Sequence, residues 1–232
     1  MLGQRFEPEH PTEVLIAALN EEEGIGATIS ELSDAIQAQR ILVVDGHSHD
    51  RTVEVAKDYG AEIVFQDGKG KGDAIAKAVK CIDSDVKYVV ITDADYTYPA
   101  EYLPTMIQIL EAYAWIGMVC GNRFYKKPIG PAFKRRFYIG NRLLAFAHNF
   151  LNGVDLKDPL TGLRVIRAEI LREWLIKSKG FDIEVELNNE VIKQGFEALE
   201  VPIEYRERLG EKKLKVKDGA TILKRIISQS IT

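Results

Sequence analysis

Residues 1–113 alternate short apolar runs, rich in β-branched side chains, with longer segments of helical periodicity. Strands are expected at 14–18, 41–44 and 62–65 and in the run that ends at Asp93. Helices are expected at 21–39, 52–59, 73–82 and 99–113. Strands that are joined through helices by short links pair in parallel. We therefore predict an α/β fold with a mostly parallel central sheet and helices on both faces.

The second half of the chain is less regular. Further strands are expected at 118–121, 163–166 and 199–203, and further helices at 131–151, 184–194 and 220–231. The strand at 118–121 is expected to lie beside the one that ends at Asp93. The densely charged stretch 206–217 is expected to form a mobile loop. Because no repeat or linker is visible, we predict a single domain over residues 1–232, with an amphipathic helix at about 219–232.

The composition excludes some classes of protein. With 46% hydrophobic and 28% charged residues, the 232-residue chain can build a sizeable core, and its net charge of −4 argues against a nucleic-acid binder. Cys81 and Cys120 lack metal-ligand spacing and are expected to be buried thiols in a reducing compartment. The polar N-terminus does not resemble a signal peptide, and no apolar run approaches the ~20 residues of a membrane span. We expect a cytoplasmic protein, either soluble or peripheral at the cytoplasmic face of a membrane.

Two carboxylates, Asp93 and Asp95, follow directly after the apolar run 88–92. Side chains at the carboxyl end of such a strand point into the crevice where α/β sheets bind ligands. Paired carboxylates suit a hard cation, Mg²⁺ or Mn²⁺, that also holds a diphosphate. The alternative is a solvated aspartate pair that opens a turn.

Three other polar segments are expected at the same edge of the sheet, because they follow strands or precede a helix. These are Asn20-Glu21-Glu22, the stretch 45–50 and Gly68-Lys69-Gly70-Lys71-Gly72. Asp45 is placed to accept hydrogen bonds from a base or ribose. The glycines would let backbone N–H groups approach a phosphate, with positive charge from Lys71. The glycine spacing matches neither the P-loop nor the Rossmann pattern.

The order of these segments closely resembles the family 2 glycosyltransferases with a GT-A fold. Downstream motifs resemble the dolichyl-phosphate mannose and glucose synthases within that family, and the resemblance covers roughly residues 13–216. The motifs shared with the wider family are 18–22, 44–52, 69–74 and 93–95, and those shared with the synthases are 121–124, 158–164 and 180–187.

The resemblance implies roles for individual residues. Nucleotide contacts are implied for Ala18, Asn20, Glu22, Asp45, Lys71, Asp73 and Asp93. A catalytic set is implied for Asp93, Asp95 and Arg123, in which the two aspartates hold Mg²⁺ or Mn²⁺. Contacts to an acceptor phosphate are implied for Arg123, Arg135 and Arg208. Thr97 stands where mannose synthases usually carry Gln, so GDP-mannose, UDP-glucose and UDP-N-acetylglucosamine all stay open as donors.

The implied reaction moves a hexose, with inversion, from a nucleotide-diphosphate sugar to a dolichyl or polyprenyl phosphate. A lipid phosphate is already anionic and needs no strong base. A soluble or glycan hydroxyl acceptor would need a carboxylate base, for which Asp158, Glu184 and Glu186 are the candidates. Glu184 and Glu186 would lie on different faces of a helix, so at most one of them faces the site. A third alternative is a nucleotide-sugar-binding protein without turnover.

Two features bear on the acceptor. Residues 133–151 are expected to form a basic, aromatic and aliphatic helix that suits an anionic membrane surface, although a core helix with a solvated basic end has the same pattern. Arg123 is expected at the rim of the crevice, where it would bind an acceptor phosphate. The alternative is a structural ion pair with Asp158 or Glu186.

Overall fold

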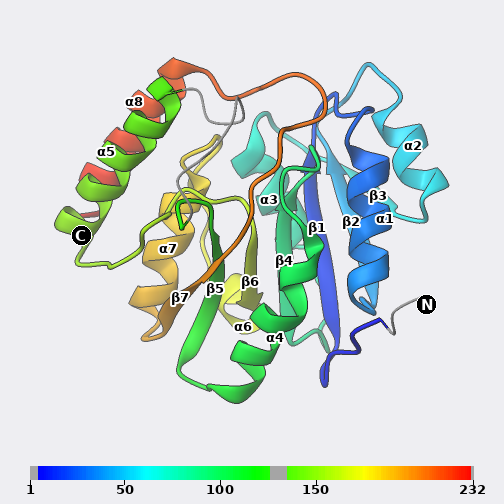
Figure 1. The fold of residues 1–232 in the computed structure, drawn as a ribbon, viewed down its shortest axis with the longest axis horizontal. Coiled ribbons are helices and arrows are strands. Elements are labelled where there is room, and N and C mark those ends of the chain that lie inside the picture. The colour runs from blue at the N-terminus through cyan, green and yellow to red at the C-terminus, as the bar shows by residue number, and fades with distance from the viewer. Residues whose placement is uncertain (1–4, 126–134, 231–232) are drawn as a thin grey trace.

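The computed structural model describes residues 5–125 and 135–230, and its centre is a seven-stranded sheet in the order β3-β2-β1-β4-β6-β5-β7 (Figure 1). The strands are β1 (Thr12–Ala18), β2 (Arg40–Asp45), β3 (Glu62–Phe65), β4 (Tyr88–Asp93), β5 (Ile116–Asn122), β6 (Arg164–Arg167) and β7 (Glu197–Pro202). The helices are α1 (Ile25–Ala35), α2 (Thr52–Asp58), α3 (Lys71–Val79), η1 (Ala100–Tyr102), α4 (Leu103–Ala112), α5 (Arg135–Asn152), α6 (Ala168–Glu173), α7 (Ile183–Lys193) and α8 (Val216–Gln229). The predicted α/β class is confirmed, and α6 is the one element of the described chain that the sequence pattern did not predict.

The strand order corrects one prediction. β5 was expected beside β4, but β6 lies between them and runs antiparallel to both, with Ile166 opposite Val89 on one side and Met118 on the other. All other pairings are parallel. Consecutive strands often pair, but the long segment between β5 and β6 lets the chain return in the opposite direction. This return carries the loop before β6 across the carboxyl end of β4.

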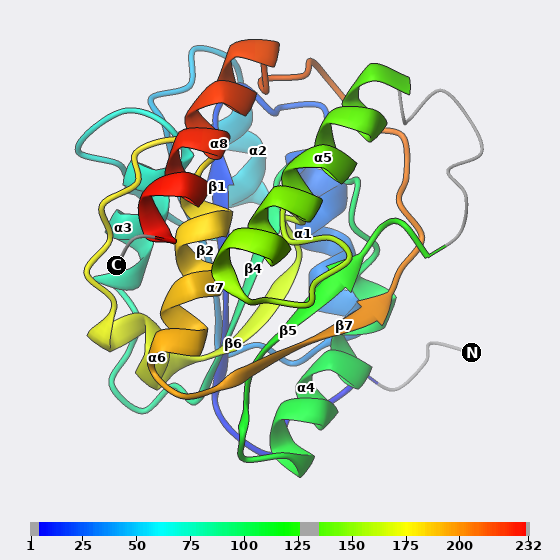
Figure 2. The same ribbon diagram turned by 90° about the vertical axis from the view of Figure 1, so that its left-hand side faces the viewer.

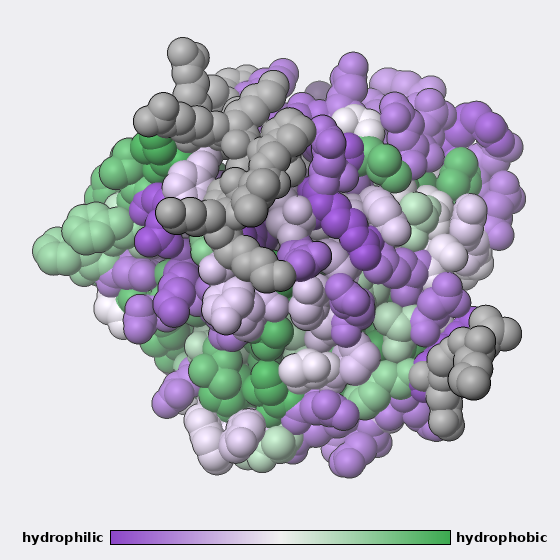
Figure 3. All heavy atoms as spheres, in the orientation of Figure 1, coloured by the Kyte–Doolittle hydropathy of each residue, from purple (hydrophilic) through white to green (hydrophobic). Residues whose placement is uncertain are grey.

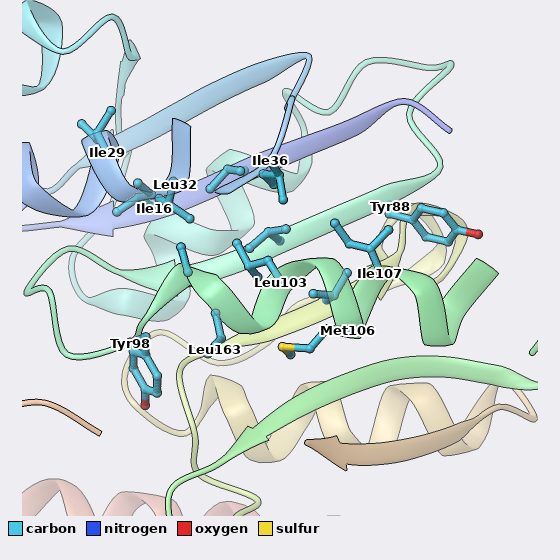
Figure 4. Close-up of a cluster of buried hydrophobic side chains, with 14 of the residues drawn as sticks. Ile16, Ile29, Leu32, Ile36, Tyr88, Tyr98, Leu103, Met106, Ile107 and Leu163 are labelled. Atoms are coloured by element: carbon cyan, nitrogen blue, oxygen red, sulfur yellow. The ribbon is translucent and has the colours of Figure 1, made fainter. Parts of the chain in front are cut away.

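The sheet is buried on both faces because its central strands alternate side chains between two hydrophobic cores. Along β1, Val14 and Ile16 face one core while Leu15 faces the other. The first core is closed by α1 and α4, whose residues Ile29, Leu32, Leu103, Met106 and Ile107 interdigitate with the sheet (Figure 4). The second core is closed by α3, α6 and α7. The rigid sheet therefore fixes the positions of the loops at its carboxyl edge.

A further layer is formed by α5 and α8, which lie side by side over α7 (Figures 1 and 2). Val185 of α7 packs with Ile222 and Ile226 of α8, and Leu144 and Ala147 of α5 complete this small core. Within the part of the chain that the structure describes, no helix combines the length and hydrophobicity needed to cross a membrane. The charged stretch after β7 contains no regular element up to the start of α8, and we call residues 203–215 the strap.

Candidate active site

A cavity of about 430 Å³ opens at the carboxyl ends of the parallel strands, where open α/β sheets bind ligands. Ala17 and Ala18 at the end of β1, Gly46 after β2 and Asp93 at the end of β4 line its floor. The strap forms one wall, and residues of α5, α7 and α8 form the opposite wall. The structure thus brings together the loops that the sequence placed at this edge.

Lys71 joins two carboxylates at the base of the cavity. Its Nζ donates to Asp93 Oδ1 and to Glu184 Oε1, each at 2.6 Å. Burial by itself would raise the pKa of Asp93, but the positive charge of Lys71, with Arg123 and Arg208 farther away, holds that pKa below its ordinary value. Asp93 is therefore ionised at neutral pH.

Asp95 is more buried than Asp93, and its hydrogen bonds with Thr97 involve only one of its two carboxylate oxygens. Its Oδ1 accepts hydrogen bonds from the hydroxyl and the backbone N–H of Thr97, at 2.6 and 3.2 Å. Its Oδ2 lies 3.5 Å from Arg208 Nη1. Burial and then the negative charge of Asp93 raise the pKa of Asp95, while Thr97 and Arg208 oppose that shift. The ionised pair is thus electrostatically costly unless further positive charge is present.

This pair fits a divalent cation. Asp95 and Asp93 both line the cavity, and carboxylate oxygens are the hard ligands that Mg²⁺ and Mn²⁺ prefer. Within residues 5–125 and 135–230 there is no group of three or more His, Cys, Asp or Glu side chains with metal-binding geometry. Asp93 and Asp95 would therefore need additional oxygens from a ligand, as a bound diphosphate provides.

Arg123 reaches the cavity while it is held by a buried carboxylate. Its Nε and Nη2 donate to the two oxygens of Asp158 at 2.6 and 2.8 Å, and the Asp158 side chain is fully buried. The ion pair with Asp158 that the sequence left open is therefore present. Because Arg123 also lines the cavity, its contact with a ligand phosphate stays a prediction.

The candidate bases for a hydroxyl acceptor all have other partners. Asp158 holds Arg123, and Glu184 holds Lys71. Glu186 accepts the backbone N–H groups of Lys177 and Ser178, both at 2.7 Å. As expected from their helical spacing, Glu184 faces the cavity and Glu186 does not.

The strap carries Arg208 into the cavity, where it meets a residue that the sequence reasoning missed. Both oxygens of Glu21 accept from Arg208 Nη2 at 2.8 Å. Burial raises the pKa of Glu21 to about 7, although Arg208 and Lys213 act in the opposite direction. The motif around residue 20 suggested Asn20 and Glu22 instead, and no local signal identified a partner 187 residues away.

Two glycines of the segment 68–72, at the start of α3, pack against protein backbone. Gly72 N–H donates to the carbonyl of Lys179 at 3.0 Å, and a Cβ on Gly72 would collide with the backbone of Ser178. Gly70 has φ 95°, which favours glycine, and its Cα faces the same carbonyl of Lys179. These glycines therefore let α3 approach the loop before α7, and the Gly72 N–H is not available to a phosphate.

Several implied nucleotide contacts lie in a loop network beside the cavity. Asp45 is fully buried and accepts from the N–H and hydroxyl of Ser48, at 2.8 and 2.6 Å. Asn20 accepts from His49 N–H, and Glu22 accepts from Arg51 N–H.

Ala18 and Lys71 line the cavity itself, whereas Asp73 accepts from the N–H of Lys69 at 2.7 Å. Arg135 begins α5, but its side chain lies outside the part of the chain that is described. The roles of all these residues toward a nucleotide or phosphate stay predictions.

Replacing Lys71 by methionine is expected to make stability strongly pH-dependent. In the parent, the lowered pKa of Asp93 stabilises the fold above the ordinary aspartate pKa, and this contribution is lost only as the pH falls through the lowered value. Without Lys71, burial raises the pKa of Asp93, so the variant loses stability as the pH rises. In urea unfolding, the difference in unfolding free energy between the parent and Lys71→Met should therefore grow between about pH 4 and pH 7.

Lys77→Met on the same helix is the matched control, because its pair with Asp67 is on the surface, where such pairs contribute ~0–1 kcal/mol. If Lys71→Met lost the same unfolding free energy at about pH 4 as at about pH 7, the assigned interaction of Lys71 with Asp93 would be contradicted.

The chain is similar to known glycosyltransferases in sequence and in fold. The model of the family described as glycosyl transferase family 2 matches residues 13–175. A dolichyl-phosphate hexose transferase of Haloferax volcanii is 36% identical over 219 residues, which cover 92% of this chain and 91% of that protein. A dolichol-phosphate mannosyltransferase of Pyrococcus furiosus is 29% identical over 88% of this chain, which spans only 59% of that longer protein.

A solved structure shares the fold at low sequence identity. Glucosyl-3-phosphoglycerate synthase of Mycobacterium tuberculosis, in complex with Mn²⁺, uridine diphosphate and glucosyl-3-phosphoglycerate, has a TM-score of 0.75 and 19% identity, over 96% of this chain and 80% of that chain. The family match covers more than half of the chain, and the Haloferax relative matches along nearly its whole length. The chain therefore belongs to glycosyl transferase family 2 and is a glycosyltransferase with a GT-A fold.

Proposed function

We propose that this glycosyltransferase moves a hexose from a nucleotide-diphosphate sugar to a polyprenyl phosphate, with inversion and with Mg²⁺ or Mn²⁺ as cofactor. The choice of a phosphate acceptor rests on the finding that the three candidate bases already have hydrogen-bonding partners. Asp158, Glu184 and Glu186 are each held by a cation or by backbone N–H groups. A hydroxyl acceptor needs a base, whereas a phosphate monoester is already anionic.

The charge of the cavity supports the same choice. Six basic side chains line its described wall, namely Lys71, Arg123, Arg208, Lys212, Lys213 and Lys215. Five acidic side chains line it, namely Glu21, Asp93, Asp95, Glu184 and Asp218. A divalent cation would leave an excess of positive charge, which suits two anionic ligands, a diphosphate and a second phosphate. The names of the Haloferax and Pyrococcus relatives point to lipid phosphates as that second anion.

The reaction follows from this arrangement. An oxygen of the acceptor phosphate forms a bond to the anomeric carbon while the bond from that carbon to the donor diphosphate breaks, and the nucleoside diphosphate leaves. Asp93 and Asp95 would hold the cation, whose chemistry is to neutralise the leaving diphosphate. Arg123 and Arg208 would orient the acceptor through planar forks that match phosphate oxygens. The enzyme thereby contributes position and charge rather than a proton acceptor.

The test is transfer of labelled hexose from a panel of GDP- and UDP-sugars to polyprenyl phosphate with Mn²⁺ or Mg²⁺. Label should appear in the organic phase with polyprenyl phosphate and be absent with polyprenol, which lacks the phosphate. The panel also decides between mannose, glucose and N-acetylglucosamine, the donors that Thr97 leaves open. Label that stays in the aqueous phase on a soluble acceptor would contradict the proposal.

We further propose that the enzyme docks on a membrane surface through α5 and α8. Exposed apolar side chains repeat along one face of α5 at Ile139, Leu143, Phe146 and Phe150, the last 77% exposed. Leu223 and Ile227 of α8, the helix that packs beside α5, are also exposed. Hydrophobic side chains accordingly gather at the α5 edge of the molecule (Figure 3). With the lysines of the strap nearby, this surface suits an anionic bilayer.

The double variant Phe146→Ser/Phe150→Ser is expected to lower binding to anionic phospholipid vesicles by about 10-fold or more, because each aromatic ring contributes large apolar area at such an interface. Its melting temperature should be unchanged, since both rings are exposed. Tyr113→Ser/Trp115→Ser removes two exposed aromatic residues from the loop before β5 and serves as the control. Equal losses in vesicle sedimentation for the two variants would contradict docking through α5.

A further inference from the structure

The backbone of the strap is fastened to the loop after β4. Arg206 N–H donates to the carbonyl of Thr97 at 3.0 Å, and Leu209 N–H donates to the carbonyl of Asp95 at 3.1 Å. Figure 1 shows the strap passing from β7 across the carboxyl edge of the sheet before it reaches α8. These two bonds place the side chain of residue 208 next to the Asp95 carboxylate.

Two arginines of the strap form ion pairs of similar length in different surroundings. Arg206 binds Glu31 of α1 through Nη1 and Nη2, at 2.7 and 2.8 Å, and stacks over the ring of Tyr96. This pair does not line the cavity. Arg208 binds Glu21 through Nη2 alone, and both of these residues line the cavity. The strap is therefore held by two ion pairs. We call the pair of Arg206 with Glu31 the outer pair and the pair of Arg208 with Glu21 the inner pair.

The inner pair leaves part of the Arg208 guanidinium without a strong partner. Nη1 is 3.5 Å from Asp95 Oδ2, which is longer than a normal hydrogen bond. Nε is buried and has no hydrogen-bond partner among the described residues. Glu21 therefore uses only part of the hydrogen-bonding capacity of the guanidinium, although buried donors are nearly always satisfied in folded proteins. Because Arg208 lines the cavity, an anionic ligand there would draw on the rest of this capacity, starting with Nη1.

The position of Glu21 is fixed independently of Arg208. Its N–H donates to Thr52 Oγ1 at 2.7 Å, and its carbonyl accepts the N–H groups of Gly24 and Ile25 at the start of α1. The backbone from which the carboxylate extends is therefore fixed, while Arg208 sits on an irregular segment. Without the Glu21 carboxylate, the nearest carboxylate for the guanidinium is Asp95.

We propose that Glu21 is a positioning residue that keeps the contact of Arg208 with Asp95 at 3.5 Å, too long for a hydrogen bond, so that the guanidinium faces the acceptor phosphate and the Asp95 oxygen stays open to the divalent cation. This inference rests on the proposed function for the identity of the acceptor. It assigns to Glu21 two effects that a simple tether of the strap would not produce. The acceptor should bind more weakly without Glu21, and so should the cation.

The first experiment compares Glu21→Gln with Glu31→Gln, which loosens the outer pair of the same strap. Glu21→Gln should raise the apparent KM for polyprenyl phosphate about 10-fold while the donor KM changes less than about 3-fold. Glu31→Gln should leave both constants within about 3-fold of the parent. If the two variants change the acceptor KM equally, Glu21 only tethers the strap and the proposal fails.

The second experiment titrates Mn²⁺ by calorimetry in the presence of GDP or UDP, without turnover. Glu21→Gln should weaken Mn²⁺ binding, because Arg208 then pairs with Asp95. The double variant Glu21→Gln/Arg208→Gln should regain most of the lost affinity, a non-additive result that a structural defect would not give. Unchanged Mn²⁺ affinity in Glu21→Gln, or no recovery in the double variant, overturns the proposal.

The two proposals can fail separately. The Mn²⁺ titration does not involve the acceptor, so it decides the role of Glu21 even for an enzyme that uses another acceptor. Absence of transfer from any donor to polyprenyl phosphate in the parent would overturn the proposed function alone.

Discussion

Replacing Asp95 by asparagine is expected to lower hexose transfer by about 100-fold or more while the protein stays folded. The amide keeps the oxygen that accepts from Thr97, so the local hydrogen bonds survive. It removes the negative charge and places a donor at the position of Oδ2, the oxygen that does not accept from Thr97. Steady-state transfer measured over a range of Mn²⁺ concentrations checks this result.

The stability of the same variant has a predicted sign. The pKa of Asp95 is raised in the folded protein, so the parent loses stability as the pH rises through that raised value. Asparagine does not titrate, and Asp95→Asn should therefore be at least as stable as the parent at pH 7 to 8.

Asp85→Asn, at an exposed position before β4, controls for the change in net charge. Transfer within a few-fold of the parent, or a large fall in melting temperature, would contradict the assignment of Asp95 to the cation.

Replacing Arg123 by methionine is expected to damage both stability and acceptor use. The change leaves the fully buried Asp158 carboxylate without its cation, and breaking a buried ion pair in this way costs about 3–5 kcal/mol. Chemical denaturation at pH 7 measures this loss. The apparent KM for polyprenyl phosphate should also rise, because Arg123 lines the cavity beside Asp93.

A second substitution separates the two effects. In Arg123→Met/Asp158→Asn the buried charge is gone, and much of the lost stability should return. In this double variant the backbone N–H of residue 123 can still donate to the side-chain oxygen at position 158, so the end of β5 should hold its conformation. The acceptor KM should remain high in the double variant while donor affinity stays near the parent value. Recovery of both stability and kinetics would show that Arg123 has only a structural role.

The pattern of the first half predicted both the sheet and the location of the site. Apolar runs such as 88–92 are strands because β-branched side chains fit a sheet that is buried on both faces, and the structure confirms β4 there. Polar residues directly after such runs must lie at the carboxyl edge. The prediction that Asp93 lies at a ligand crevice therefore needed no knowledge of long-range contacts.

Contacts between residues that are far apart in the chain could not be predicted from the sequence. The motif around Asn20 indicated the correct loop but not that Glu21, rather than its neighbours, faces the cavity. The lysine–glycine segment suggested a phosphate cradle, and the sequence did not show that Gly70 and Gly72 pack against residues 178–180. A one-residue shift in a loop changes which side chain points inward, and local periodicity carries no information about that direction.

What the sequence by itself determined is the class of fold, the approximate bounds of most elements and the edge of the sheet at which the cavity opens, because these follow from local periodicity and from the end of an apolar run. The tertiary structure alone decided that β6 lies between β4 and β5, that Asp158 holds Arg123 and that Glu21 holds Arg208. An ion pair forms between whichever opposite charges the packed layers bring together, and many acidic residues along this chain could have paired with each arginine. Burial selects among them, since a charge removed from water must find a partner within a few ångströms.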